Sequence, residues 1–314
     1  MKNMKNYAAM AVLLISGMMM TSGCSVLTEV EASTFKETTQ SGQESLEAYS
    51  LASREGEDSG ISRLEKIKEQ GYIEVATEPY FAPFEFIDPL KSGDEKYVGA
   101  DIELARYIAD SLGVELRIVP LDFTAVLSSV TEGKYDMAIS ALAYSPARAE
   151  AMELSDGYYY SGEAVQYGLL IRDEDLQDIK STSDLKDKVV VVQSGSIQEG
   201  FAMDQLPEGY GELKRVSATT DGFLMVQEGK ADACITATST AELYLEANPD
   251  CKMIIAPEIS FTVDEETQGT RIGIKKGETE LLNAVNEIIS EVTESGVYEE
   301  WYEEYSEYAG SLGI

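Results

Sequence analysis

The chain has 314 residues, of which 57 are acidic, 24 are basic and none is histidine, so its formal net charge is −33. So large an acidic excess excludes nucleic-acid binding, which needs a basic face, and the lack of histidine excludes a histidine-containing triad or a histidine-ligated metal site. The length and a hydrophobic content of 44% predict a soluble protein whose core is large enough for two lobes.

The amino terminus has the pattern of a secretory signal. Lysines precede an apolar run over residues 7–20 that is too short to span a membrane, and Thr21-Ser22-Gly23-Cys24 follows it. Small residues before a cysteine resemble the lipobox of bacterial lipoproteins, although Thr21 stands where leucine is usual. We predict a signal peptide over 1–23 and a lipidated Cys24 that holds the protein at the outer face of a cell membrane. The alternative is an ordinary secreted protein with an incidental cysteine.

Residues 24–60 are predicted to form the lipidated cysteine and a flexible tether. The segment is rich in Ser, Thr, Glu, Gln and Gly and has few large apolar residues, so it cannot bury enough surface to offset chain entropy. A globular body begins at about Ile61. Further along, Cys234 and Cys251 could pair in a secreted compartment, but two cysteines make no disulfide framework, and we expect free thiols.

The start of the body alternates helix and strand signals. Ser62 and Glu65 form a capping box that begins a short helix ending at Gly71. A strand over 72–77 leads into residues 78–86, where prolines and aromatics predict a shaped loop at the edge of the sheet that binds ligands in open α/β folds. The elements that follow are a helix over 102–112, a strand over 114–120 and a helix to about 131. This order predicts right-handed crossovers and a mostly parallel sheet.

A turn after the strand over 137–142 places a basic side chain at a helix start. Ser145 suits the N-cap and Pro146 the first helical position, so Arg148 falls in the first turn. A cation there is unfavourable, because free N–H groups and the positive dipole end already occupy that terminus. An anion held between the amides and the guanidinium would remove the conflict. The pattern predicts a carboxylate site; the alternative is a solvated surface arginine.

The second half of the chain repeats the alternation. Residues 165–171 are expected to cross between lobes, and the run 189–192, apolar on both faces, predicts a buried parallel strand. After it, Ser196 and Glu199 form a second capping box, and Gly195 lets the backbone approach a ligand. The remaining elements are a helix over 220–228, strands over 233–236 and 270–274, a helix to about 294 and a last helix after Gly296. The aromatic residues of the last helix, expected to pack on the first lobe, are Tyr298, Trp301, Tyr302 and Tyr305.

From Ser62 to the C-terminus, these segments resemble the bacterial extracellular solute-binding proteins of family 3, the polar amino-acid receptors of ABC importers. The S-P-A-R turn and the following L-S-D-G-Y resemble T-x-T-x-x-R and F-S-x-P-Y of that family, and E-P-Y-F-A-P-F-E-F resembles its T-D-x-x-Y-P-P-F-E-F segment. The resemblance implies an α/β fold of the periplasmic-binding-protein-like type II, with two α/β lobes joined by a two-strand hinge. Lobe 1 would comprise 61–162 and 271–314, and lobe 2 would comprise 163–270.

The resemblance also implies a ligand site. Arg148 matches the arginine that holds the ligand carboxylate, with the Ser196 hydroxyl and the Ile197 N–H opposite it. Phe81 and Phe123 would sandwich the ligand, and Glu78 would meet its side chain. The other candidates, at the ends of two strands, are Ser140, Ala141, Ala143, Thr236 and Ala237.

Two positions depart from the family pattern. Ala143 lacks a hydroxyl that often helps to hold the carboxylate, and Ala237 replaces the aspartate that pairs with the α-ammonium. Because an unpaired buried ammonium is costly, either another group such as Glu78 or Thr236 takes the charge or the ligand is not a standard α-amino acid.

We therefore predict a monomeric substrate-binding lipoprotein that captures a polar or basic amino acid and delivers it to a membrane permease. No catalytic role, cofactor or metal is expected. Two alternatives remain, because a fold does not determine a function. One is a secreted enzyme of the same fold, such as a dehydratase, with Glu78 as its acid or base; the other is a receptor for a carboxylate that is not an α-amino acid.

Overall fold

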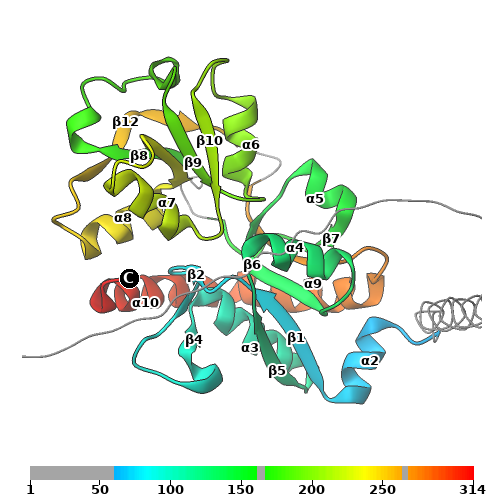
Figure 1. The fold of residues 1–314 in the computed structure, drawn as a ribbon. Coiled ribbons are helices and arrows are strands. Elements are labelled where there is room, and N and C mark those ends of the chain that lie inside the picture. The colour runs from blue at the N-terminus through cyan, green and yellow to red at the C-terminus, as the bar shows by residue number, and fades with distance from the viewer. Residues whose placement is uncertain (1–59, 161–166, 264–267) are drawn as a thin grey trace, which may run out of the picture. The chain divides into compact units, whose positions relative to one another are not determined.

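The computed structural model describes residues 60–160, 167–263 and 268–314, which belong to one structural unit, Gly60–Ile314 (Figure 1). The predicted signal peptide, Cys24 and nearly all of the predicted tether lie outside the described residues. Residues 161–166 and 264–267, which include part of the predicted connections between the lobes, also lie outside the described residues. The fold is mixed α/β with two lobes, each built on a five-stranded sheet, as expected from the sequence.

Lobe 1 is built on a sheet with the strand order β5-β1-β6-β13-β7. The neighbours β5, β1 and β6 run parallel, as the alternation of helices and strands predicts, whereas β13 runs antiparallel to β6 and β7. Strand β13 comes from the far end of the chain, so the lobe is discontinuous in sequence. The strands are β1 (Tyr72–Thr77), β5 (Glu115–Pro120), β6 (Met137–Ala143), β7 (Met152–Leu154) and β13 (Thr270–Lys275).

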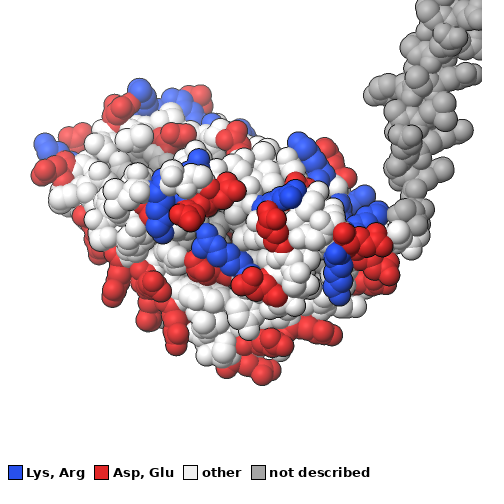
Figure 2. Space-filling model, turned by 90° about the horizontal axis from the view of Figure 1, so that it is seen from below, with Lys and Arg blue, Asp and Glu red and all other residues white. Residues whose placement is uncertain are grey.

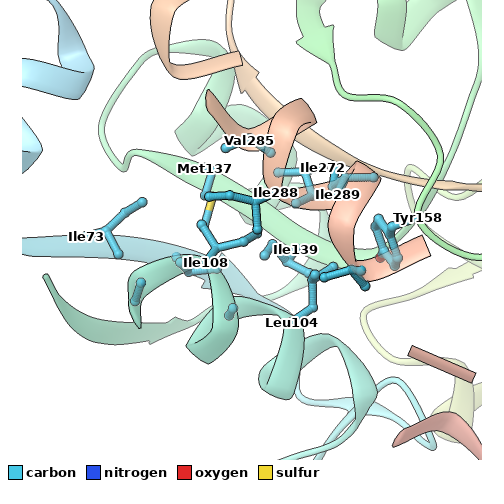
Figure 3. Close-up of a cluster of buried hydrophobic side chains, with 14 of the residues drawn as sticks. Ile73, Leu104, Ile108, Met137, Ile139, Tyr158, Ile272, Val285, Ile288 and Ile289 are labelled. Atoms are coloured by element: carbon cyan, nitrogen blue, oxygen red, sulfur yellow. The ribbon is translucent and has the colours of Figure 1, made fainter. Parts of the chain in front are cut away.

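Helices cover both faces of this sheet. Figure 3 shows side chains of α3, α9 and the central strands converging in the main core, among them Ile108, Ile288 and Met137. On the other face α4 packs against β1 and β6, with Val126 and Ala76 fully buried. The helices are α2 (Arg63–Gln70), α3 (Ala100–Leu112), α4 (Phe123–Thr131), α5 (Pro146–Ala151), α9 (Thr279–Ser295) and α10 (Val297–Leu312).

Local signals predicted several of these boundaries. The capping box of Ser62 and Glu65 is present and begins α2, and Gly71 ends the helix in the left-handed conformation. Helix α3 starts at Ala100, slightly earlier than predicted. The predicted shaped loop over 78–86 contains short strands that form a small antiparallel sheet with a later segment. Its members are β2 (Tyr80–Phe81), β3 (Glu85–Ile87) and β4 (Tyr97–Val98), and a 3₁₀ turn, η1 (Gly93–Lys96), precedes β4.

Lobe 2 has the strand order β10-β9-β11-β8-β12. Strand β9 is parallel to β10 and β11 and almost entirely buried, as its run of valines predicts. Helix α6 covers one face, while α7 and α8 cover the other. The elements are β8 (Tyr167–Arg172), η2 (Asp173–Asp175), η3 (Thr182–Leu185), β9 (Val189–Gln193), α6 (Ile197–Asp204), β10 (Glu212–Val216), α7 (Thr219–Gln227), β11 (Ala233–Ala237), α8 (Thr238–Ala247) and β12 (Met253–Phe261).

The lobes touch through elements far apart in sequence. Helix α10 of lobe 1 packs against α8 of lobe 2, and α7 of lobe 2 lies against β2 of lobe 1. In Figure 1 the red α10 lies below the yellow α8. The C-terminal helix therefore belongs to the wall of the space between the lobes as well as to lobe 1.

The surface carries the acidic excess of the composition. Figure 2 shows Asp and Glu side chains spread over the viewed face, with fewer Lys and Arg among them. Cys234 is buried, Cys251 is half-buried, and both are free thiols, as predicted. Among the described residues, no helix combines the length and apolarity needed to cross a membrane, and no cluster of acidic, cysteine or histidine side chains could hold a metal ion.

Candidate functional site

A cavity of about 250 Å³ lies between the lobes, where strands β1 and β6 of lobe 1 and β9 and β11 of lobe 2 end. The carboxyl ends of strands are where ligands bind in open α/β sheets. Every candidate from the sequence lines this cavity except Thr236: they are Glu78, Phe81, Phe123, Ser140, Ala141, Ala143, Arg148, Ser196, Ile197 and Ala237.

Arg148 is the cation of the cavity. Ser145 caps α5 by accepting from the Arg148 N–H at 3.2 Å, and the arginine side chain is buried rather than solvated. Its Nη1 donates to the Ala143 carbonyl at 2.6 Å and its Nη2 to the Gly195 carbonyl of lobe 2 at 3.1 Å. None of the ion pairs among the described residues involves Arg148, and burial lowers its pKa to about 10, so it stays charged at neutral pH. Guanidinium has five N–H donors, and those not bonded to carbonyls can serve a carboxylate.

The turn at Gly195 brings lobe 2 close to α4. Gly195 has a φ of +76°, and a Cβ there would lie 3.2 Å from the Thr124 Cγ2 atom. The predicted capping box is only half present: Ser196 accepts from the Glu199 N–H, but the Glu199 carboxylate accepts from the Gly195 N–H instead of from Ser196. The Ser196 hydroxyl also donates to the Gln193 carbonyl at 2.7 Å, so it has no further proton to donate to a ligand. The Ile197 N–H is the better donor for a ligand.

Glu78 is the buried acid of the cavity. Only 2% of its surface is exposed, its N–H donates to the Ser140 hydroxyl at 3.0 Å, and its Oε1 has no hydrogen-bond partner among the described residues. Burial raises the pKa of Glu78 to about 8, against the opposing effect of a hydrogen bond with Gln193. A cationic group placed beside it would meet a carboxyl group whose Oε1 is free to accept.

Asp101 lies behind the cavity, and the sequence patterns gave it no role. It is fully buried and accepts from the Ala141 N–H at 2.7 Å, from the Tyr158 hydroxyl at 2.9 Å and from the Tyr298 hydroxyl at 2.5 Å. The bond from Ala141 holds a residue with a φ of +46°, a conformation that is strained for a side chain other than glycine. Asp101 thus fixes the floor of the cavity through backbone and side chains from three segments.

Glu85, which belongs to the F-E-F segment matched to the family but was given no role from the sequence, completes this network. It is fully buried and accepts from the Ser140 hydroxyl at 2.8 Å, while no hydrogen donor reaches its Oε2 among the described residues. Burial, and then the negative charge of Asp101, raise the pKa of Glu85 well above its ordinary value. Burial raises the pKa of Asp101 as well, so the pair favours holding a proton, and a protonated Glu85 that donates to Asp101 would satisfy both side chains.

Aromatic rings form another wall, and one of them corrects an expectation. Tyr298, Trp301 and Tyr305 pack onto lobe 1 as predicted. Tyr302, expected only to pack, also lines the cavity and stacks on Tyr159 with ring centroids 4.6 Å apart. No local pattern distinguishes it from its neighbours, because the contact depends on how α10 meets α8.

Thr236 is placed differently from the expectation. Its side chain is buried within lobe 2, its hydroxyl donates to the neighbouring Ala237 carbonyl at 3.4 Å, and it does not line the cavity. It faces away because successive strand residues point to opposite faces of the sheet. Cavity residues that were not among the sequence candidates are Phe84, Glu85, Tyr159, Tyr167, Gln193, Gln198, Thr238, Ser239, Glu242, Thr270 and Tyr302.

A protein-family model matches most of this chain. Bacterial extracellular solute-binding proteins, family 3, match residues 73–308. The arginine-binding extracellular protein ArtP of Bacillus subtilis is 28% identical over 225 residues, which are 72% of this chain and 82% of that protein. The L-cystine-binding protein TcyJ of Escherichia coli is 26% identical over 249 residues, 78% of this chain and 87% of TcyJ.

Solved structures agree in fold. The amino acid ABC transporter substrate-binding protein AbpA of Streptococcus pneumoniae, solved bound to L-arginine, has a TM-score of 0.69 and 34% identity, covering 78% of this chain and 98% of that one. The ancestral amino acid-binding protein AncCDT-1, described as a precursor of cyclohexadienyl dehydratase, has a TM-score of 0.65 and 29% identity, covering 78% and 99% of the two chains.

Proposed function

The chain belongs to the bacterial extracellular solute-binding proteins of family 3, and from that premise we propose that its cavity receives an amino acid with a cationic side chain, arginine first of all. It is the extracytoplasmic substrate-binding protein of an ABC importer, and it captures a small amino acid between its lobes for delivery to a permease. The choice of a cationic ligand goes beyond this family role and depends on the charges in the cavity.

The observation that supports this choice is a buried cation and a buried acid in one cavity. Arg148 and Glu78 both line the cavity, both are buried, and neither belongs to an ion pair among the described residues. A charge on either group is costly in a buried site unless an opposite charge meets it. A ligand with a carboxylate at one end and a guanidinium or ammonium at the other satisfies both, whereas a neutral amino acid leaves Glu78 without an ionic partner.

The α-ammonium needs a partner of its own, because Ala237 carries no charge. Thr236 does not line the cavity, and Glu85 is committed to Asp101. The lining carboxylate that remains, besides Glu78, is Glu242 on α8. We assign the α-ammonium to Glu242. The stacked rings of Tyr159 and Tyr302 line the same cavity and offer surfaces that favour a cation.

Titration calorimetry with arginine, lysine, citrulline and N-acetylarginine tests the ligand class. Citrulline keeps the shape of arginine without the charge, and N-acetylarginine lacks the α-ammonium. We expect arginine to bind most tightly, citrulline much more weakly and N-acetylarginine little. Equal affinity for arginine and citrulline would contradict the role of Glu78, and preference for N-acetylarginine would show that the ligand is not a standard α-amino acid.

We propose in addition that Cys24 carries lipid and anchors the mature protein to the membrane. The support is the sequence Thr21-Ser22-Gly23-Cys24 after an apolar signal. Mass spectrometry of the membrane-extracted protein would show a lipidated Cys24 as the first residue, and Cys24→Ser would release the protein into the medium. Recovery of the unchanged protein in the medium would exclude the anchor.

We propose binding without catalysis, although the likeness to AncCDT-1 links the fold to a dehydratase lineage. The support is that relatives in the family are named as binding proteins. Arginine recovered unchanged after prolonged incubation, measured by mass spectrometry, is the expected result. Appearance of a product that depends on Glu78 would establish an enzyme.

A further inference from the structure

The buried carboxyl of Glu78 has surroundings that disfavour a negative charge. It is 2% exposed and Oε1 has no donor among the described residues. The cation that shares the cavity, Arg148, is bonded to the carbonyls of Ala143 and Gly195. Burying a carboxylate without a cation or a full set of donors is costly, and the group avoids the cost by taking up a proton.

Most of the charged side chains on the helices and strands that surround Glu78 are acidic. Asp122 at the N-cap of α4 and Asp221 on α7, both exposed, act on it with negative charge. The titratable groups that face it or share its cavity are Glu85 on β3 and Asp101 behind it on α3, Arg148 on α5, Glu242 on α8, and the hydroxyls of Tyr159, Tyr167 and Tyr302. Arg148 is thus the basic side chain near several acids, and no lysine lines the cavity among the described residues.

Resting on the proposed function, we propose that Glu78 is protonated in the ligand-free protein and that capture of a cationic amino acid expels this proton to solvent. The O–H bond of the carboxyl breaks, the proton passes to buffer, and the carboxylate pairs with the ligand cation, which keeps its own proton. Glu78 is therefore a specificity-determining residue whose preference for cations over neutral isosteres grows as pH rises.

The proton comes from Glu78 and not from the neighbouring pair. The proton of Glu85 has Asp101 as its acceptor, and Asp101 is held by donors from Ala141, Tyr158 and Tyr298. Because Glu85 accepts from Ser140 and its proton goes to Asp101, a ligand cation meets Glu78, whose Oε1 is free to accept. The pair keeps one negative charge and one proton whether or not the cavity is filled.

The raised pKa of Glu78, about 8, fixes the expected size of the effect. At pH 7 such a group is about nine-tenths protonated, so binding of arginine releases about 0.9 proton. Affinity for arginine then rises about ninefold between pH 6 and pH 7, since the proton competes with the ligand. Citrulline has the same α-ammonium and α-carboxylate but no side-chain charge, so its affinity stays nearly constant over this interval.

Calorimetry of the full chain with arginine at pH 7, in buffers of different ionisation enthalpy, counts the protons released. The expected result is close to one proton for arginine, and none for citrulline wherever its heat is measurable. Glu78→Gln, which keeps the size and neutral state of the side chain, is expected to bind arginine more weakly, without proton release and without the rise in affinity from pH 6 to pH 7.

The outcomes separate this inference from the proposed function. Tight arginine binding with no proton release, and with equal affinity at pH 6 and pH 7, would show that Glu78 is already ionised and would overturn the inference while leaving the cationic ligand in place. Release of the same proton from the Glu78→Gln variant would assign it to another group and would also overturn the inference. A chain that binds citrulline but not arginine would overturn the proposed function and the inference together.

Discussion

The shared proton between Glu85 and Asp101 predicts opposite outcomes for two substitutions that each replace one carboxyl by an amide. Glu85→Gln keeps a neutral side chain of the same shape, whose amide N–H can donate to Asp101 while its oxygen accepts from Ser140. Asp101→Asn removes the negative charge that accepts from Ala141, Tyr158 and Tyr298. The two variants are expected to behave differently because Glu85 is the neutral partner of the pair and Asp101 is the charged one.

The size of the loss follows from the bonds to Asp101. A hydrogen bond to a charged group contributes about 1.5–3 kcal/mol and a neutral one about 0.5–1.5 kcal/mol, so neutralising the acceptor of three such bonds costs roughly 3 kcal/mol. In Asp101→Asn the Ala141 N–H, which is fixed by the backbone, still donates to the asparagine side-chain oxygen. The asparagine N–H₂ group then faces the Tyr158 and Tyr298 hydroxyls, which donate to Asp101 in the native protein. Glu85→Gln is expected to change the free energy of unfolding by less than about 1 kcal/mol.

Urea unfolding of the ligand-free protein at pH 7 gives both free energies by linear extrapolation. We expect Asp101→Asn to lower the midpoint clearly and Glu85→Gln to leave it nearly unchanged. A loss of 3 kcal/mol or more in Glu85→Gln, together with a mild effect of Asp101→Asn, would place the proton on Asp101 and refute the assignment.

Three further predictions follow from single residues. Arg148→Ala should raise the Kd for arginine by about 30- to 5,000-fold in calorimetry, since removing one partner of a buried charge pair costs about 2–5 kcal/mol, and unchanged affinity would exclude the carboxylate site. Gly195→Ala should lower the Tm by roughly 2–8 °C, because its φ of +76° is strained for alanine and the new Cβ would crowd Thr124; Gly200→Ala in α6, with open space around it, is the matched control and should not lower the Tm. Because the folded pKa of Glu78, about 8, lies above its ordinary 4.5, the folded state holds the extra proton and ligand-free stability falls by up to about 1.4 kcal/mol per pH unit as pH rises through this interval. Between pH 5 and pH 7, the urea midpoint of Glu78→Gln should fall less than that of the native protein. An equal fall in both proteins would show that other groups cause the loss of stability.

Local sequence determined the elements and much of the cavity wall. Helix boundaries at Ser62, Gly71 and Ser145 follow from caps, because a cap satisfies backbone groups within a few residues and depends little on the rest of the fold. Strand ends could be assigned from short apolar runs, and ligands bind at the carboxyl ends of such strands. Together with the resemblance to family 3, this placed Arg148 and Glu78 at one site before any tertiary contact was known.

The tertiary structure decided which side chains meet across long separations. No sequence pattern gave Glu85 or Asp101 a role, and only packing removes them from water and brings two tyrosines from distant segments onto one carboxylate. Tyr302 lines the cavity because α10 returns to α8, and Thr236 is excluded because β11 turns its hydroxyl away. Charge state depends on burial and on neighbours from several segments, so the sequence identified the acids of this protein, whereas the folded structure decided which of them are neutral.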